Sequence, residues 1–495
     1  MNEPLIPGFY PDPTICRAGE DYYLAHSSFE YFPGVPLWHS RDLQEWRQIG
    51  HILTRRSQFA RGDGSSSGGI YAGTLRHHRG RFLYATTNVS DFDAGQMIVH
   101  ADDPAGGWSD PVHVPGAMGI DPDLAWDDED TCYLTWKAMS WAEGEIGILQ
   151  SRIDPETGQL LDTPYPVWQG SGLAAAEGPH LYHHDRQWYL LLAEGGTERG
   201  HAVTVARGPS PAGPFTSCPD NPILTHSSTP HPIQGTGHAD LVSNSGGGWA
   251  AVYLGTRPHG STPGFHVLGR ETFLAGIGWH DGWPVFDEAR YAVTPSDTGF
   301  VDDFTGPALD QRWVVPGGDP ATMVKPAAAS GIELLPAADS RSDHQLDAAL
   351  LCTRIRDLRW SAEATLDGPG RFGLRLDDRH HYSLVRHADR VDAVARIGDL
   401  DTVVGSVSVD AGSVALGIEA ADPERRPGLF TNMGPDQIVL SVHDPNGRRD
   451  LARLDGRYLS TEVAAGFTGR MIAIGATTVP TTVRQVTYRP VRRRA

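Results

Sequence analysis

Three carboxylates and two other polar residues recur at one position relative to five short aromatic segments. Asp12, Tyr71, Asp121, Glu177 and His238 each lie ten or eleven residues before the second residue of such a segment. Taken singly, each acid also fits a turn or a solvated loop, since Asp beside Pro is common in turns. Three acids brought together repel one another, and folds keep such sites mainly where chemistry uses the shifted pKa values. One protonated and one ionised carboxyl would suit hydrolysis of a glycosidic bond.

The elements that must position these residues form a repeat in the first three hundred residues. Each unit has a short aromatic strand, and several continue with a second strand and a Pro/Gly-rich turn. Strand-and-turn units at a period of about 40–60 residues predict propeller blades. We expect five blades in a ring, each burying its faces against its neighbours, with the five residues around one axis. The aromatic segments are 21–24 (DYYL), 81–84 (RFLY), 131–134 (TCYL), 187–190 (QWYL) and 248–251 (GWAA).

The segments that carry these residues resemble glycoside hydrolase family 43. They are 8–13 (GFYPDP), 67–72 (SGGIYA), 119–124 (GIDPDL), 177–182 (EGPHLY) and 237–242 (GHADLV). Segments 29–36 (FEYFPGVP) and 268–274 (LGRETFL) are similar to the β-xylosidase and α-L-arabinofuranosidase branch of that family. The resemblance implies a hydrolase that inverts the anomeric configuration.

The same resemblance implies roles for the three acids. Asp12 is expected to be the general base that activates water, and Glu177 the general acid. Asp121 is expected to orient Glu177 and raise its pKa. Because inversion needs room for a water molecule, the carboxyls of Asp12 and Glu177 should lie roughly 6.5–9.5 Å apart.

Four further residues are candidate substrate contacts by resemblance, and each has a structural alternative. Arg270 would bind sugar hydroxyls, or form a structural salt bridge. Phe32 and Tyr71 would form an aromatic wall for a pentose ring, or belong to the propeller core. His238 would lie near the channel centre, as a structural histidine or in contact with a calcium ion through water. No cofactor is required, and a structural Ca²⁺ at the propeller centre is left open.

The chain from residue 301 onward predicts a second domain. We place the propeller catalytic domain at 1–300 and a concanavalin-like β-sandwich at 301–495, giving an all-β protein. Segments 455–462 (DGRYLSTE) and 466–469 (GFTG) resemble the sandwich of the same hydrolase branch. By that resemblance the sandwich packs on the propeller and closes the pocket, which implies exo action on short oligosaccharides. An independent carbohydrate-binding module is the alternative.

Composition and charge exclude several other classes of protein. The 57 Gly, 37 Pro and 13 Trp favour short strands and tight turns, and the net charge of −20 argues against a nucleic-acid partner. With no secretory signal or membrane span visible, we expect a cytoplasmic protein without a membrane partner. The four cysteines suit buried thiols. A homo-oligomer is expected only from family habit.

The interpretation that fits these observations best is a β-xylosidase that releases terminal xylose from β-1,4-xylo-oligosaccharides. An α-L-arabinofuranosidase or a dual-activity enzyme is the first alternative, because both sugars can present similar hydroxyls to one pocket. A non-catalytic carbohydrate-binding propeller is the second. Retaining fructan hydrolases share the architecture, but their Asn-Asp-Pro-Asn and Arg-Asp-Pro segments are missing from the sequence.

Overall fold

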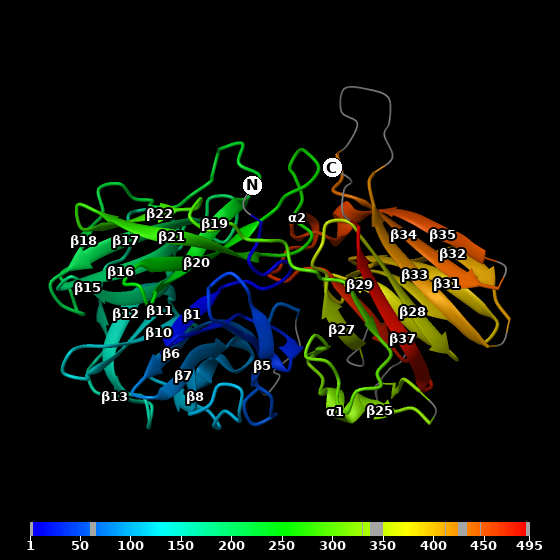
Figure 1. The fold of residues 1–495 in the computed structure, drawn as a ribbon, viewed down its shortest axis with the longest axis horizontal. Helices are drawn as coiled ribbons and strands as arrows, with labels where there is room; N and C mark the ends of the chain where they lie inside the picture. The colour runs from blue at the N-terminus through cyan, green and yellow to red at the C-terminus, as the bar shows by residue number, and fades with distance from the viewer. Residues whose placement is uncertain are drawn as a thin grey trace. The chain divides into compact units, whose positions relative to one another are not determined.

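The computed structural model of the chain is built almost entirely from antiparallel strands (Figure 1). It describes residues 3–59, 66–328, 330–336, 350–410, 412–423, 433–445 and 447–491. The chain folds into two compact units. The first comprises Met1–Ile6, Tyr10–Thr256 and Arg270–Pro295, and the second Pro7–Phe9, Arg257–Gly269 and Ser296–Ala495. No helix among the described residues has the length and apolar character that crossing a membrane requires.

The first unit contains five antiparallel sheets, each made of strands from one continuous stretch of the chain. The first sheet consists of β1 (Thr14–Ala18), β2 (Asp21–Ala25), β4 (Gly34–Ser40) and β5 (Arg47–Leu53), with the short β3 (Tyr31–Phe32) between β2 and β4. The second consists of β6 (Ile70–His78), β7 (Arg81–Asn88), β8 (Gln96–Ala101) and β9 (Val112–Val114), with the 3₁₀ turn η1 (Val89–Ala94). The third consists of β10 (Gly119–Trp126), β11 (Cys132–Ser140), β12 (Gly144–Asp154), β13 (Gln159–Leu160) and β14 (Tyr165–Pro166).

The remaining two sheets of the first unit repeat this pattern. The fourth consists of β15 (Glu177–His184), β16 (Gln187–Glu194), β17 (Ala202–Gly208) and β18 (Thr216–Ser217). The fifth consists of β19 (Gln234–Ser243), β20 (Trp249–Thr256), β21 (Glu271–His280) and β22 (Trp283–Asp287). The aromatic segments of the sequence repeat fall on the second strand of each sheet.

The five sheets close into a ring, which confirms the predicted five-bladed propeller. The first strands of successive sheets contact one another in the order β1, β6, β10, β15 and β19, and β19 contacts β1. Five hydrophobic clusters fill the gaps between neighbouring blades. One, for example, joins Leu37 of the first blade to Tyr84 of the second, and another joins Leu24 of the first to Val252 of the fifth. Each blade therefore buries its faces against its neighbours, as the repeat predicts.

The second unit is a β-sandwich. One sheet has the strand order β25-β26-β37-β28-β33-β34-β35, with β23 also paired to β37, and the other has the order β27-β36-β29-β30-β31-β32. One core fills the space between the sheets, because alternate residues such as Leu416 of β33 and Phe372 of β29 point inward. The strands and helices of the second unit have these bounds: β23 (Phe300–Asp302), β24 (Val315–Pro316), α1 (Pro320–Met323), β25 (Val324–Pro326), β26 (Ile332–Leu334), β27 (Leu350–Arg354), β28 (Trp360–Asp367), β29 (Gly370–Arg375), β30 (His380–Arg386), β31 (Arg390–Ile397), β32 (Leu400–Ser408), β33 (Ser413–Ala421), β34 (Gln437–Asp444), β35 (Gly447–Asp455), η2 (Gly456–Leu459), α2 (Thr461–Ala464), β36 (Met471–Gly475) and β37 (Thr481–Pro490).

The four cysteines have buried side chains, as the sequence predicts. They are Cys16, Cys132, Cys218 and Cys352.

Candidate active site

The five residues singled out by the repeat all lie where the chain enters a first strand of the propeller. Asp12 lies two residues before β1, Tyr71 and Asp121 lie near the starts of β6 and β10, Glu177 begins β15, and His238 lies within β19. The pairing of β6, β10, β15 and β19 with the following strand shifts register at these positions. Such bulges re-aim side chains, and here they recur at the same phase in successive blades.

The backbone is left-handed at three of these five residues and at Gly178, the neighbour of Glu177. The φ angles are 51° at Asp12, 56° at Asp121, 54° at Gly178 and 46° at His238. Asp and His enter this region more easily than most residues, and Gly enters it freely. Conformations of this kind cost roughly 1–3 kcal/mol each and cluster at functional sites, where the surrounding structure holds them.

Asp12 is a buried carboxylate with two close hydrogen-bond donors. Arg270 Nη1 donates to its Oδ1 at 2.8 Å, and Ser27 Oγ donates to its Oδ2 at 2.6 Å. Burial alone would raise the pKa of Asp12, but the charge of Arg270, the largest opposing influence, and the hydrogen bond from Ser27 help to lower it below its usual value. Asp12 is therefore ionised near neutral pH.

Asp121 and Glu177 form a coupled pair whose pKa values move the other way. Burial is the main cause of the raised pKa of both groups; the charge of Asp12 adds to both, and repulsion by Glu177 adds to that of Asp121. The backbone N–H of Gly178 donates to Asp121 Oδ2 at 3.1 Å, which favours the ionised form of Asp121. The pair holds a proton more tightly than free carboxyls do, and the raised pKa of Glu177 is in the direction that the sequence predicts.

Arg270 belongs to the same cluster, and its salt bridge is the one to Asp12. The same Nη1 donates to Thr197 Oγ1 at 3.0 Å, and the guanidinium carbon lies 5.8 Å from the ring centre of Phe29. Thr197 follows β16, so three segments fix the guanidinium beside the carboxylate. The salt-bridge alternative for Arg270 is thus confirmed, and its contact with sugar hydroxyls stays a prediction.

The two candidate aromatic residues have different surroundings. Tyr71 is partly exposed and lies 5.1 Å from the ring of Phe29. Burial raises the pKa of Tyr71 to about 12, while Arg270 lowers it and the site carboxylates raise it. Phe32 is 2% exposed and packs in a blade core with Phe59 and Ile70. Tyr71 thus lies among the charged groups, whereas a substrate contact of Phe32 stays a prediction.

His238 is a neutral neighbour of Asp12. Its Nδ1 lies 3.8 Å from Asp12 Oδ1, and burial lowers its pKa to about 4. Burial likewise lowers the pKa of His201, a nearby residue just before β17, to about 3. Two uncharged imidazoles leave Arg270 as the positive charge that Asp12 contacts most closely.

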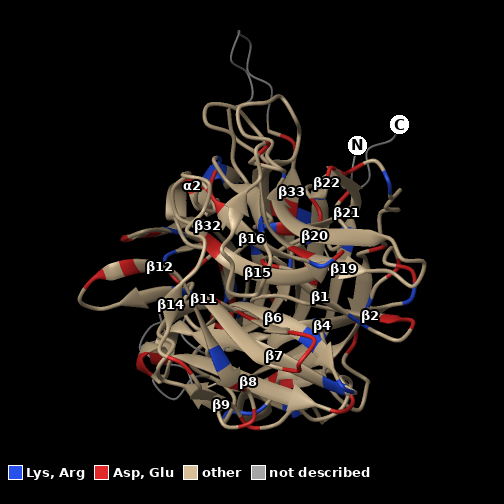
Figure 2. Cartoon of the chain, turned by 90° about the vertical axis from the view of Figure 1, so that its left-hand side faces the viewer, with Lys and Arg blue, Asp and Glu red and all other residues tan. Residues whose placement is uncertain are grey.

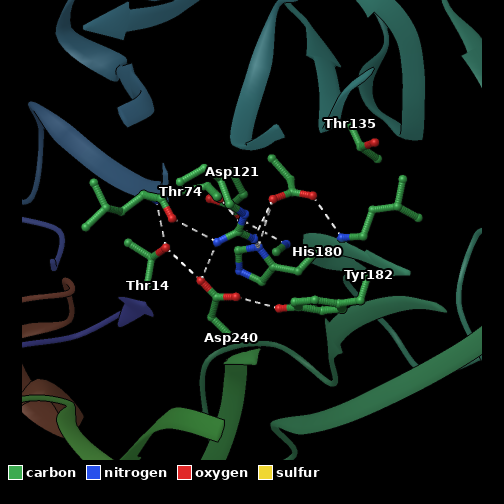
Figure 3. Close-up of polar contacts among 12 residues, drawn as sticks. Thr14, Thr74, Asp121, Thr135, His180, Tyr182 and Asp240 are labelled. Atoms are coloured by element: carbon green, nitrogen blue, oxygen red, sulfur yellow. Dashed lines mark hydrogen bonds and ion pairs between the residues drawn. The ribbon is translucent and has the colours of Figure 1, made fainter. Parts of the chain in front are cut away.

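A buried ionic network lies beside these residues at the hub of the ring (Figure 3). The Arg76 guanidinium lies between Asp123 and Asp240, with Nη2 to Asp123 Oδ1 at 2.7 Å and Nη1 to Asp240 Oδ2 at 2.9 Å. Thr14 Oγ1 donates to Asp240 Oδ2 at 2.7 Å, and the hydroxyl of Tyr182 donates to Asp240 Oδ1. These residues come from the first strands of all five blades, so that the network joins the ring at its axis.

A calcium ion at the hub stays a prediction, and the charged residues there argue against direct coordination. Calcium requires six to eight oxygen ligands, and the carboxylates nearest the axis, Asp123 and Asp240, already share the Arg76 guanidinium. No group of three or more potential ligand residues that could hold a metal ion occurs in the described ranges. His238 contributes a nitrogen, which calcium does not prefer.

Replacing Arg76 by Met is expected to destabilise the propeller by about 3–5 kcal/mol, because two fully buried carboxylates lose their partner. Arg79→Met is the matched control. Arg79 is 72% exposed and pairs with the surface residue Asp130, so its loss should cost about 0–1 kcal/mol. The measurement is the free energy of unfolding of both variants, taken from the first transition in urea. Equal losses would contradict a structural role of the hub network.

Sequence reasoning missed five residues of this cluster: Ser27, Phe29, Lys137, Thr197 and His201. Ser27, Phe29, Thr197 and His201 lie in or beside loops outside the repeated phase, so the period carries no sign of them. Lys137 carried a visible signal, because it is one of only two lysines in the chain. Its Nζ lies 3.3 Å from Glu177 Oε2.

A propeller whose axis gathers one ionised carboxylate and a second carboxyl of raised pKa is the architecture of a glycoside hydrolase. The comparison with known families agrees. Residues 1–284 match the model of the glycosyl hydrolases family 43, and the chain belongs to this family.

Relatives are similar over different shares of the chain. The non-reducing end α-L-arabinofuranosidase BoGH43B of Bacteroides ovatus is 43% identical over 96% of this chain and 91% of its own length. A xylosidase/arabinosidase of Butyrivibrio fibrisolvens is 45% identical, but over 57% of this chain and 56% of its own length, little more than half of that relative.

Solved structures are similar over the whole chain. A Bacteroides ovatus GH43B structure from a xyloglucan locus has a TM-score of 0.88 at 30% identity and covers 99% of this chain and 100% of that chain. A xylan β-1,4-xylosidase from Bacillus halodurans has a TM-score of 0.87 at 26% identity with the same coverage.

Proposed function

We propose that this glycoside hydrolase is an exo-acting, inverting β-xylosidase that releases terminal xylose from β-1,4-xylo-oligosaccharides. The observation that carries the proposal is one cluster in which the pKa of Asp12 is lowered and the pKa of Glu177 is raised. Opposite shifts in neighbouring carboxyls divide the base from the acid. Asp12 and Asp121 are 4% and 6% exposed, and such a deep site suits the end of a chain better than its middle.

In the proposed reaction Asp12 removes a proton from water as the oxygen of that water attacks the anomeric carbon. Ser27 and Arg270 hold the Asp12 carboxylate in place through both oxygens. Glu177 gives its proton to the glycosidic oxygen as the bond from that oxygen to the anomeric carbon breaks. Asp121, whose pKa is also raised, accepts the Gly178 N–H and forms with Glu177 a pair that holds a proton tightly.

The two pKa shifts define a pH dependence. Activity needs Asp12 ionised, so it should rise as pH passes the lowered pKa of Asp12. Activity also needs Glu177 protonated, so it should fall as pH passes the raised pKa of Glu177. Both shifts widen the range of pH in which the two groups have the states that the reaction requires.

An α-L-arabinofuranosidase, or an enzyme with both activities, is the second candidate. The relative matched over 96% of this chain is named an α-L-arabinofuranosidase, whereas other relatives are named β-xylosidases. The same three carboxylates would serve either sugar, so the choice depends on the hydroxyls that the pocket binds.

Comparison of kcat/KM on nitrophenyl β-D-xyloside and nitrophenyl α-L-arabinofuranoside tests the assignment. We expect the xyloside to be the better substrate, with measurable activity on the arabinofuranoside. A kcat/KM that is higher on the arabinofuranoside would replace the first candidate by the second. Binding of xylo-oligosaccharides without turnover of either substrate would favour a non-catalytic propeller.

A further inference from the structure

Lys137 is a buried lysine in a chain that uses arginine for almost all its positive charge. Of 41 Lys and Arg residues, only Lys137 and Lys325 are lysines. Lys137 lies on β11 with its side chain 5% exposed. Its Nζ is 3.3 Å from Glu177 Oε2 and 2.9 Å from Glu145 Oε1. One ammonium group therefore bridges the candidate acid and a carboxylate of β12.

This contact opposes the role of Glu177. A positive charge beside a carboxyl favours the ionised form, and Lys137 is the largest influence that lowers the pKa of Glu177. A general acid must keep its proton until the leaving oxygen takes it. A buried lysine beside Glu177 with no compensating charge would therefore weaken the acid.

Glu145 supplies the compensation. Its carboxylate is closer to the ammonium than Glu177 is, and its side chain is 58% exposed. Glu145 lies on the hairpin that joins β11 to β12, which projects from the propeller and carries acidic segments near its end (Figure 2). The compact ammonium of lysine has three rotatable donors, so that one group can donate to both carboxylates at once.

We propose that Lys137 and Glu145 are positioning residues that set the protonation of Glu177. Lys137 donates to Glu177 Oε2, which leaves Oε1 to carry the acidic proton. Glu145 neutralises the ammonium charge, so that Glu177 is held in place without losing that proton. This inference rests on the proposed role of Glu177 as the general acid.

The other charged groups that face Glu177 are buried and have fixed partners. Asp12 is paired with Arg270, and Asp121 accepts a hydrogen bond from Gly178, next to which the ring of His238 packs. Asp12 and Arg270 have side chains that are 5% and 8% exposed. Glu145 differs from them in being open to solvent, so that its charge can be removed without disturbing the buried cluster.

The test compares the pH profile of kcat/KM in Glu145→Gln, Lys137→Met and the control Glu143→Gln. Glu143 is exposed on the same hairpin, and its replacement removes an equal charge two residues away. In Glu145→Gln the ammonium loses its exposed partner and keeps its contact with Glu177, so the basic limb should move to lower pH by about half a unit or more, with the plateau retained. In Lys137→Met the basic limb should move to higher pH. Glu143→Gln should leave it in place.

Opposite movements of one limb are an outcome that a merely structural role would not give. Lys137 is buried, and if Lys137→Met fails to fold, Glu145→Gln against Glu143→Gln still decides the question. An unmoved limb in Glu145→Gln, or equal movement in Glu143→Gln, would overturn the inference. Glu177→Ala, assayed on a substrate whose leaving group needs no proton, separates the two proposals. If this variant shows that Glu177 is not the general acid, both proposals fall. If it shows that Glu177 is the general acid, an unmoved basic limb in Glu145→Gln overturns only the inference about Lys137 and Glu145.

Discussion

Glu177→Ala is expected to lower kcat/KM on an unactivated xylobioside by about 100- to 10,000-fold, the usual contribution of a general acid. On a dinitrophenyl β-D-xyloside the loss should be small, because that leaving group departs without a proton. The reason lies in the raised pKa of Glu177, because burial, its main cause, favours the protonated form of this carboxyl. The measurement is kcat/KM for both substrates with both proteins.

Glu177→Gln serves as the control for shape, since the amide has the size of the carboxyl but cannot deliver the proton. It should reproduce the selective loss on the unactivated substrate. Equal damage on both substrates would remove Glu177 from the role of acid, because a fault in binding or folding does not depend on the leaving group.

Asp12→Asn is expected to lower kcat/KM by about 100- to 10,000-fold on both substrates, because the attacking water needs a base whatever the leaving group. The amide preserves the size of the side chain beside Ser27 and Arg270, the two donors to the carboxylate. It removes only the charge that accepts the proton of water.

Ser27→Ala is the matched variant for Asp12. It removes one hydrogen bond to the carboxylate and leaves the base in place, so we expect a loss of about tenfold. Similar losses in Ser27→Ala and Asp12→Asn would indicate that the cluster, and not the charge of Asp12, limits the rate. Recovery of Asp12→Asn on the dinitrophenyl substrate would exchange the roles of Asp12 and Glu177.

The sequence predicts the five-bladed ring and the convergence of the acids well, and the reason is the repeat. Residues at the same position of the repeat lie at the same distance from the propeller axis in every blade. The five blades therefore bring together Asp12, Tyr71, Asp121, Glu177 and His238. The contact between β1 and β19, which closes the ring, follows from the same repeat. The alternation of inward residues likewise predicts the strands of the sandwich.

Other features of the site have no periodic signal. The left-handed backbone at Asp121 and His238 lies at bulges that only paired strands reveal. Thr197 reaches Arg270 from a loop, so its role follows from tertiary contacts. Phe32 shows a different limit of the sequence, because its residue type alone fits a sugar-binding platform and a blade core equally well. In the structure Phe32 is buried in a blade core.

The most direct test of an inverting hydrolase built on these three carboxylates is proton NMR of the first xylose released from a β-xyloside. Attack by a water that Asp12 activates, on the side of the sugar opposite the leaving group, predicts α-xylose as the initial product, before mutarotation. Initial release of β-xylose would mean that a carboxylate attacks the sugar itself, and it would contradict the roles assigned to Asp12 and Glu177.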